Sequence, residues 1–280
     1  MEINLTTHLG FGGASLTSMR SYADVKDLLN TAYSLGIKHF DTSDLYGKGY
    51  SELIYGHFLK DKRKDITITT KFGLGQPFSA NQLPISLLLP LNYHLKTIKN
   101  AIKKPQLINE PHYTPVAVRE INRQYVEACF KASLNRLKTD YIDYYLLHEG
   151  LPNFLTDAAF DYLLDRKKQG QIRHIGLATN VLDIKALNRG GVENWDVLQY
   201  EGYNENDVLT IKNKFPNKLH FHHSCLKNRD DLKVENVSED DKIGYILAQN
   251  ILNNKKGKII FSTRNKNYLN ANIQAVKKFV

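Results

Sequence analysis

Four ionisable side chains stand at the ends of three consecutive apolar segments. Asp41 ends IKHFD and Tyr46 follows it five residues later, while Lys71 ends ITITTK and His148 ends YIDYYLLH. A phenol can donate a proton to an oxygen that gains negative charge, but an unperturbed phenol has a pKa of about 10. A neighbouring ammonium lowers that pKa, and a carboxylate keeps the ammonium charged. Together these residue types are typical of proton delivery to a carbonyl oxygen.

The positions of these side chains along the chain strengthen that interpretation. Any one of them alone is more often a turn aspartate, a surface lysine or the polar end of a strand. In a parallel barrel, the carboxyl ends of the strands surround the mouth where catalysis takes place. Four ionisable groups at three consecutive strand ends therefore favour a shared site over coincidence.

The elements that must position these residues are short strands separated by amphipathic helices. The predicted strands are His8–Gly12, Ile37–Asp41, Ile66–Thr70, Tyr141–Leu147, Ile172–Ala178, Val197–Tyr200, Leu219–His222 and Lys258–Phe261. Helical periodicity is found in SYADVKDLLNTAYSLG, AVREINRQYVEACFKASLNRL, DAAFDYLLDRKKQG, KIGYILAQNILNN and NYLNANIQAVKKF. In the first of these, Ser21 and Asp24 are spaced as a helix cap. Strict alternation of strand and helix over residues 1–280 predicts a single-domain α/β fold, namely a closed (β/α)8 TIM barrel. The sequence contains no GxGxxG motif after a strand, so a Rossmann domain is not indicated.

One connection is much longer than the others. Residues 72–114 separate the third strand from its helix, where two to six residues are usual. The segment contains the apolar stretch LPISLLLPL and the basic stretch YHLKTIKNAIKK, which is predicted to be helical. A long loop at this end of a barrel lies above the active site. We therefore expect a packed, lid-like insertion that contributes substrate contacts.

The amino-acid composition indicates which kinds of partner the protein binds and in which compartment it is found. The formal charge of +9 favours anionic partners, but the lysines are scattered, which favours a small anionic ligand over nucleic acid. Cys129 and Cys225 are far apart in the sequence, which suits a reducing compartment, although a single disulfide between them is a possibility that the sequence leaves undecided. The first residues show no signal peptide, and no run of about 18 apolar residues suggests a membrane span. The expectation is a cytoplasmic protein, monomeric or homodimeric, without a nucleic-acid or membrane partner.

Over nearly its whole length the chain resembles the aldo-keto reductases. GIKHFDTSDLYGKGYSELIYG is similar to the signature stretch of that family, and TTK, YIDYYLLH, IRHIGLATN, VLQYEGYN and FSTRNKNYLNANI follow in the family's order. The resemblance implies a TIM barrel that binds NADP(H) at the carboxyl ends of its strands. It also implies that Asp41, Tyr46, Lys71 and His148 are the catalytic tetrad. In that role His148 orients the carbonyl.

The resemblance also implies a set of cofactor-binding residues. They are Asp41, Thr179, Asn180, Gln199, His223, Ser224, Leu226, Thr263, Arg264, Asn265, Tyr268 and Asn272. Thr179, Asn180 and Gln199 correspond to the residues that hold the nicotinamide carboxamide. Arg264 and Asn265 correspond to residues at the adenosine 2′-phosphate, and Asn272 to one at the adenine.

Two positions in the cofactor set depart from the family pattern. His223 replaces the usual aromatic residue that stacks on the nicotinamide, and Tyr268 replaces a glutamine. The neighbouring His220 and His222 suggest a metal site, but strand alternation places these two on the opposite face from His223. No metal site is therefore expected.

The sequence thus predicts NADPH-dependent reduction of an aldehyde, ketone or sugar to an alcohol, with Tyr46 as proton donor. Two alternatives stay open. One is an NADP(H)-binding regulatory protein of the same fold with little turnover. The other is a Schiff-base aldolase that uses Lys71 as nucleophile. The physiological substrate is not indicated by the sequence.

Overall fold

Eight parallel strands form a closed barrel in the computed structural model, which describes residues 7–74, 83–102, 119–227, 229 and 237–280. The strands are β1 (Leu9–Gly12), β2 (His39–Asp41), β3 (Thr67–Phe72), β4 (Ile142–His148), β5 (Ile172–Ala178), β6 (Val197–Glu201), β7 (Leu219–His223) and β8 (Lys258–Phe261). Each pairs with the next along the chain, and β8 pairs with β1 to close the ring. The predicted TIM barrel is therefore confirmed, with each strand within two residues of its expected bounds.

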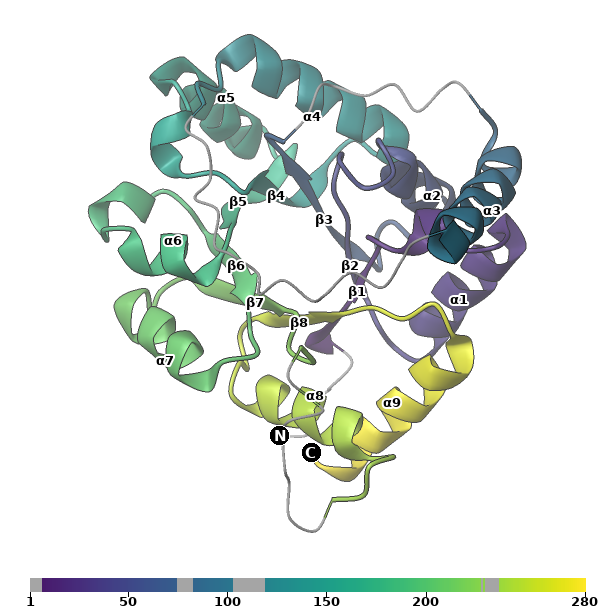
Figure 1. Ribbon diagram of the computed structural model, residues 1–280. Helices are drawn as coiled ribbons and strands as arrows, with labels where there is room; N and C mark the ends of the chain where they lie inside the picture. Colours follow the sequence, from purple (N-terminus) through teal and green to yellow (C-terminus); the bar gives the residue numbers. More distant parts are fainter. Residues whose placement is uncertain (1–6, 75–82, 103–118, 228, 230–236) are drawn as a thin grey trace.

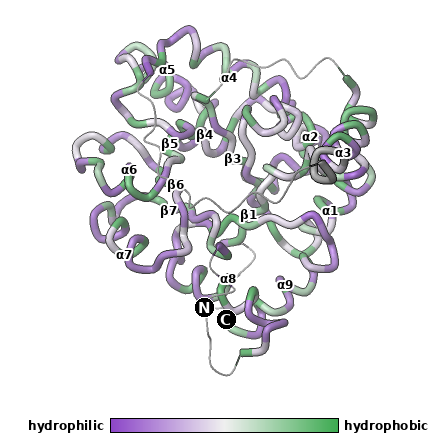
Figure 2. The backbone as a smooth tube through the Cα atoms, in the orientation of Figure 1, coloured by the Kyte–Doolittle hydropathy of each residue, from purple (hydrophilic) through white to green (hydrophobic). Residues whose placement is uncertain are grey.

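Helices surround the barrel and alternate with the strands, except that two helices lie between β3 and β4 (Figure 1). They are α1 (Tyr22–Ser34), α2 (Tyr50–Leu59), α3 (Ile85–Ile102), α4 (Arg123–Leu137), α5 (Asp157–Lys168), α6 (Val181–Ala186), α7 (Glu205–Lys214), α8 (Lys242–Leu252) and α9 (Lys266–Lys278). Short 3-10 turns lie at Leu16–Ser18 (η2), Pro152–Phe154 (η3) and Gly190–Val192 (η4). The predicted cap of α1 is confirmed, because Ser21 Oγ accepts a hydrogen bond from the Asp24 amide at 3.1 Å. Hydrophilic and hydrophobic residues interchange along the helices (Figure 2), as amphipathic elements packed on a barrel require.

Two apolar regions hold the fold together. The larger lies between the sheet and the helices, and the smaller fills the barrel with residues such as Leu146, Val197 and Ile260. Inside the barrel, the His39 ring meets the rings of Tyr144 and Phe221 edge-on, with centroids 5.5 and 5.2 Å away. The interior is therefore packed with side chains and provides a rigid floor beneath the mouth.

A buried polar chain lies on the outer face of β6 and β7. His220 Nε2 donates to the Phe215 carbonyl at 3.0 Å, so its Nδ1 carries no proton and accepts from the Tyr200 hydroxyl at 2.9 Å. The Tyr200 oxygen in turn accepts from His222 Nε2 at 3.2 Å. The predicted alternation is confirmed, because His220 and His222 share this face while His223 lines the barrel mouth.

The described part of the long connection between β3 and α4 contains the helix α3. This helix packs against η2 and α1 at the edge of the barrel. Asn92 Nδ2 donates to the Thr17 carbonyl at 3.3 Å, and the Tyr50 hydroxyl contacts the Leu83 backbone carbonyl and amide at 3.0 and 3.1 Å. The predicted helix in this segment is therefore confirmed, and it is anchored beside the first βα unit.

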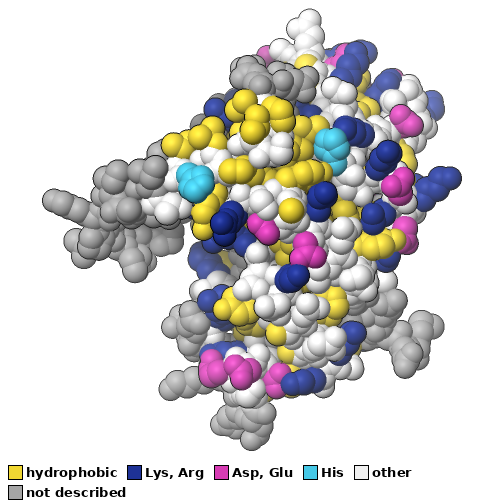
Figure 3. All heavy atoms as spheres, turned by 90° about the vertical axis from the view of Figure 1, so that its right-hand side faces the viewer, with side chains coloured by type: hydrophobic (Ala, Val, Ile, Leu, Met, Phe, Trp, Pro, Cys, Tyr) yellow, Lys and Arg dark blue, Asp and Glu magenta, His cyan; other side chains and the backbone are white. Residues whose placement is uncertain are grey.

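Residues 75–82 and 103–114 of the predicted lid lie outside the described residues, so its placement over the mouth stays a prediction. Figure 3 shows the side of the molecule on which α3 lies, where hydrophobic side chains gather. Leu87, Leu91 and Leu95 of α3 are among the exposed ones, at 61%, 49% and 49%. These leucines are spaced four residues apart and form one ridge of the helix.

Two further findings concern the described residues as a whole. None of their helices is both long enough and apolar enough to cross a membrane. Cys129 of α4 and Cys225 after β7 are buried free thiols, so the disulfide that the sequence left open is not formed.

Candidate active site

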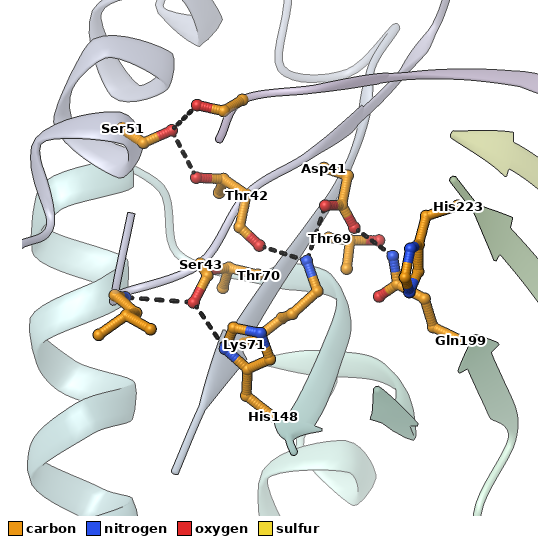
Figure 4. A network of polar contacts seen from close by, with 12 residues as sticks. Asp41, Thr42, Ser43, Ser51, Thr69, Thr70, Lys71, His148, Gln199 and His223 are labelled. Atoms are coloured by element: carbon orange, nitrogen blue, oxygen red, sulfur yellow. Dashed lines mark hydrogen bonds and ion pairs between the residues drawn. The ribbon is translucent and has the colours of Figure 1, made fainter. Parts of the chain in front are cut away.

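A buried charge pair lies at the ends of β2 and β3. Lys71 Nζ donates to Asp41 Oδ1 and to the Thr42 carbonyl, each at 2.7 Å (Figure 4). Gln199 Nε2, from β6, donates to the other Asp41 oxygen at 3.0 Å. Burial lowers the pKa of Lys71, but the negative charges of Asp41 and Tyr46 raise it by more, so the net pKa of Lys71 is above its usual value. The lysine is therefore held as an ammonium, as the sequence predicts.

Tyr46 lies beside this pair in the loop after β2. The Lys71 ammonium is 5.3 Å from the centre of the Tyr46 ring, and the ring of His148 is 6.0 Å away at 84°. Lys71 lowers the pKa of Tyr46, but burial and the Asp41 and Glu149 carboxylates raise it more, so the net pKa is above the usual value. The expected lowering by Lys71 is present but is outweighed, because the sequence does not show how deeply the phenol is buried.

His148 completes the group from the end of β4. Its Nδ1 lies 3.1 Å from Ser43 Oγ, at the end of β2. Burial, together with the positive charges of Lys71 and Arg119, lowers the pKa of His148 to about 3. The imidazole is therefore neutral near pH 7 and can either donate or accept through Nε2.

These four residues line one cavity of about 730 Å³ at the carboxyl ends of the strands. The other predicted residues in its wall are Thr179, Asn180, Gln199, His223, Ser224 and Leu226. The structure thus brings together the predicted catalytic residues and seven of the twelve predicted cofactor residues, counting Asp41. In the described part of α3, no residue lines this cavity.

Several of these side chains already have intramolecular partners. Asn180 caps α6, because its Oδ1 accepts from the Asp183 amide at 2.9 Å and its Nδ2 donates to the Asp183 carboxylate at 2.6 Å. Thr179 Oγ1 also donates to that carboxylate, at 3.3 Å. Gln199 differs, because its Oε1 is buried without a hydrogen-bond partner. A buried acceptor of this kind is suited to an amide N–H from a ligand.

The residues that follow β7 form another part of the wall. His223 Nδ1 lies 2.9 Å from Ser224 Oγ, and Ser224 has a positive φ of 56°. Burial lowers the pKa of His223, against the opposing effect of the Glu201 and Asp41 carboxylates. The imidazole therefore presents an uncharged ring to the cavity near neutral pH.

The predicted 2′-phosphate residues line a second cavity, of about 620 Å³, between α1, α3 and the start of α9. Arg264, Asn265 and Lys266 share its wall with Arg20 and with Tyr93 of α3. Two carboxylates, Asp24 and Asp27, also line it, so the cavity is not purely cationic.

Not every donor near the second cavity is available to an anion. Lys266 pairs with Asp27 at 2.6 Å, and Asn265 Oδ1 accepts from the amides of Asn267 and Tyr268. The expected contribution of these helix amides to anion binding is therefore reduced, because Asn265 already caps them. Arg264 and Arg20 are exposed guanidinium groups in the wall of this cavity.

The remaining predicted cofactor residues lie near the start of α9. The Thr263 hydroxyl accepts from the Asn265 amide at 3.1 Å. Tyr268 is 65% exposed, and Asn272 is half-buried one turn further on. Neither Tyr268 nor Asn272 lines either cavity, so their predicted contacts with a cofactor stay predictions.

Comparison with known proteins decides the family. A sequence profile of the Aldo/keto reductase family matches residues 8–204, which hold β1 to β6 and all four predicted catalytic residues. The chain belongs to the aldo/keto reductase family. The matched span ends before β7, so eight of the twelve predicted cofactor residues, from His223 onward, lie beyond it.

Individual relatives within the family are distant. The chain is 28% identical over 173 residues to the uncharacterized oxidoreductase YqkF of Bacillus subtilis, which covers 62% of this chain and 45% of that protein. It is 28% identical over 190 residues to the NADH-specific methylglyoxal reductase of Escherichia coli, covering 66% and 47%. The matches thus span less than half the length of these curated relatives.

The solved structures agree with the barrel described above. An aldo-keto reductase from Klebsiella pneumoniae in complex with NADPH superimposes with a TM-score of 0.62 at 14% identity, covering 96% of this chain and 85% of that chain. At this identity the similarity is one of fold.

The sequence did not single out four polar residues at the mouth of this family member. Glu149 and Glu201 line the cavity, and Ser43 and Asp44 lie directly behind His148. All four adjoin a strand end that the sequence does identify, and this adjacency is the one signal that points to them. Their roles depend on side-chain directions that the linear pattern does not contain.

Proposed function

We propose that this protein is an NADPH-dependent oxidoreductase that reduces a carbonyl group of an aldehyde, ketone or sugar to an alcohol. The observation that carries the proposal is the buried Asp41–Lys71 pair at 2.7 Å, beside Tyr46 and His148 in one cavity. A buried ion pair is costly to place, and such pairs are common at functional sites. Here it lies at the mouth of the barrel, where this fold positions its chemistry.

The residues around this cavity fit a nicotinamide cofactor. The unpartnered Gln199 Oε1 offers an acceptor for a carboxamide N–H, and Thr179 lies in the same wall. Arg264 and Arg20, in the second cavity, offer guanidinium groups to a phosphate. The cofactor, when bound, supplies the hydride that reduces the carbonyl carbon. The relatives are divided, since one is named as NADH-specific and one solved structure contains NADPH.

The protein's own residues would manage the charge on the carbonyl oxygen. Tyr46 donates its phenolic proton to that oxygen as negative charge develops there. Lys71 stabilises the phenolate that remains, and Asp41 keeps the lysine charged and in place. Neutral His148 hydrogen-bonds the carbonyl and holds it toward Tyr46.

The alternative of a Schiff-base aldolase is less well supported. A lysine nucleophile must lose its proton, whereas the pKa of Lys71 lies above its usual value once Asp41 and Tyr46 act against burial. No observation on the described residues favours a purely regulatory role. The oligomeric state stays a prediction of monomer or homodimer.

Replacement of Tyr46 tests the proposal. Tyr46→Phe should lower kcat for carbonyl reduction by about 100-fold or more and leave NADPH affinity within about twofold, because the hydroxyl acts on the transition state. The measurements are NADPH oxidation with a panel of aldehydes, ketones and sugars, and NADPH binding by fluorescence.

Tyr141→Phe is the matched control, since Tyr141 lies just before β4 at the opposite end of the barrel. It should turn over like the parent protein. Near-parental turnover by Tyr46→Phe would show that another group donates the proton.

A further inference from the structure

A short chain of buried polar groups lies directly behind His148. Ser43 Oγ is 3.1 Å from His148 Nδ1 (Figure 4). Ser43 Oγ is also 3.2 Å from Asp44 Oδ1, and it accepts a hydrogen bond from the Leu45 amide at 3.1 Å. Ser43 and Asp44 are fully buried, at 0% and 1% exposure, and His148 is 9% exposed. The chain thus runs from the cavity wall into the protein, and Asp44 is its inner end.

The serine cannot serve both neighbours in the same way. A hydroxyl has one hydrogen and two lone pairs, and the Leu45 amide occupies one lone pair. If the Ser43 hydrogen points to an ionised Asp44, the remaining lone pair must accept from His148 Nδ1–H, which leaves Nε2 bare. If Asp44 is protonated and donates to Ser43, the serine hydrogen points to Nδ1, and Nε2 carries the proton.

We propose that Ser43 and Asp44 are positioning residues that set the tautomer of His148, so that one proton on Asp44 decides whether Nε2 donates or accepts at the cavity. The proton balance is complete. On acidification one proton enters at Nε2 from the cavity, Nδ1 passes its proton to Ser43, and Ser43 passes its own to Asp44. The inference rests on the proposed function only for its catalytic consequence, not for the tautomer itself.

The surroundings of Asp44 make this proton change near neutral pH. Asp44 Oδ2 is buried without a hydrogen-bond partner. Burial and the Glu52 carboxylate of α2 raise the pKa of Asp44 to about 7, against Ser43, the Arg136 guanidinium of α4 and the Leu45 amide. Three more titratable groups face it: Lys71 of β3, Cys129 of α4 and Tyr145 of β4. His148, whose pKa is about 3, stays neutral throughout this range.

The two tautomers suit opposite directions of the proposed reaction. An Nε2–H group can donate to a carbonyl oxygen and so favours reduction. A bare Nε2 can accept the hydroxyl proton of an alcohol and so favours oxidation. We therefore expect the ratio of reduction to oxidation to fall as the pH rises through about 7.

The direct test is the tautomer of His148 in the cofactor-free protein. Histidine-selective ¹⁵N labelling distinguishes protonated from bare ring nitrogens, and His148→Gln assigns the His148 signals. In the parent protein, the Nε2–H form should give way to the Nδ1–H form between about pH 6 and 8, with the ring neutral at both ends. A tautomer that does not change over this range would overturn the proposal.

Two substitutions separate the roles of the chain. Asp44→Asn keeps the shape and offers an N–H to Ser43, so the Nε2–H form should persist at every pH in the series. Ser43→Ala cuts the link and should remove the pH dependence. A pH-dependent tautomer that persists unchanged in either variant would refute the assignment. If Asp44→Asn does not fold, the parent titration and Ser43→Ala still decide.

The kinetic consequence is measured separately. Asp44→Asn should lower alcohol oxidation at pH 8 by about tenfold and leave reduction at pH 6 within about twofold, because only one tautomer remains. Equal losses in both directions would indicate a structural effect only. The proposed function and the proposed tautomer control fail in different ways. Full activity of Tyr46→Phe would refute Tyr46 as proton donor but would not affect the NMR test of the His148 tautomer.

Discussion

Acidification should destabilise this protein, because the imidazoles buried between the barrel and its helices take up protons when the chain unfolds. His222 offers the clearest measurement of this effect. His222 is 1% exposed, and burial, with the nearby His220, Lys212 and His223, lowers its pKa to about 3 from 6.5. The unfolded chain therefore binds more protons than the folded protein below about pH 6.5. The stabilisation is fully present above that pH and is lost as the pH falls toward 3.

The size of the effect follows from these two pKa values. Between pH 7 and pH 5, linkage gives a loss of about 2 kcal/mol for His222. His220, with a pKa of about 4, and His148, with a pKa of about 3, each add a similar loss. Asp44 acts in the opposite direction, because its pKa is raised to about 7 and the folded state takes up its proton first.

A single substitution separates His222 from these other groups. His222→Leu should reduce the loss of unfolding free energy between pH 7 and pH 5 by about 2 kcal/mol relative to the parent. At pH 7 the variant should lie within about 1 kcal/mol of the parent, since it loses one hydrogen bond to Tyr200 but removes the unpartnered His222 Nδ1.

The assay is urea unfolding, followed by circular dichroism, of both proteins at pH 7, 6 and 5. His94→Leu is the matched control, because His94 is solvent-exposed on α3. The same pH-dependent loss in His222→Leu as in the parent would refute the reasoning, since it would mean that His222 does not take up a proton on unfolding in this range.

Two further predictions concern charged groups elsewhere. Arg264→Ala should weaken NADPH binding by about 10- to 100-fold and hardly change NADH binding, since a charge-assisted phosphate contact contributes about 1.5–3 kcal/mol; titration calorimetry measures both, and equal losses would remove Arg264 from the phosphate site. Arg136→Met should destabilise the fold by about 3–5 kcal/mol, because it leaves the fully buried Glu52 carboxylate without the guanidinium 2.5 Å away. Adding Glu52→Gln should recover most of that stability in urea unfolding, and no recovery would show that packing rather than charge causes the loss.

The sequence predicts the barrel, and it predicts that the four catalytic candidates lie together at its mouth, for a definite reason. Strands that are buried on both faces have continuous apolar runs, and the polar residue that ends each run marks the mouth. Asp41, Lys71 and His148 are all visible in this way. Tyr46 is found because it follows one of these ends within a few residues.

What the sequence does not give are the effects of residues brought together by the fold. The net pKa of Tyr46 depends on burial and on Glu149, which comes from another strand end. The pairing of Lys266 with Asp27 joins α9 to α1, 239 residues apart. The Ser43–His148 contact spans 105 residues in the same way. Local patterns carry no information on such distances.

The Asp41–Lys71 pair is positioned mainly by the backbone pairing of the strands. Asp41 lies opposite Thr69 in the β2–β3 ladder, Lys71 lies opposite Leu146 in the β3–β4 ladder, and the Thr42 carbonyl holds the lysine from the same edge. The strand register thus fixes the position of both charges, since moving the pair would require a whole strand to slip relative to its neighbour. The separation of the two charges is therefore fixed by strand pairing, whereas Tyr46 depends on the loop that follows β2.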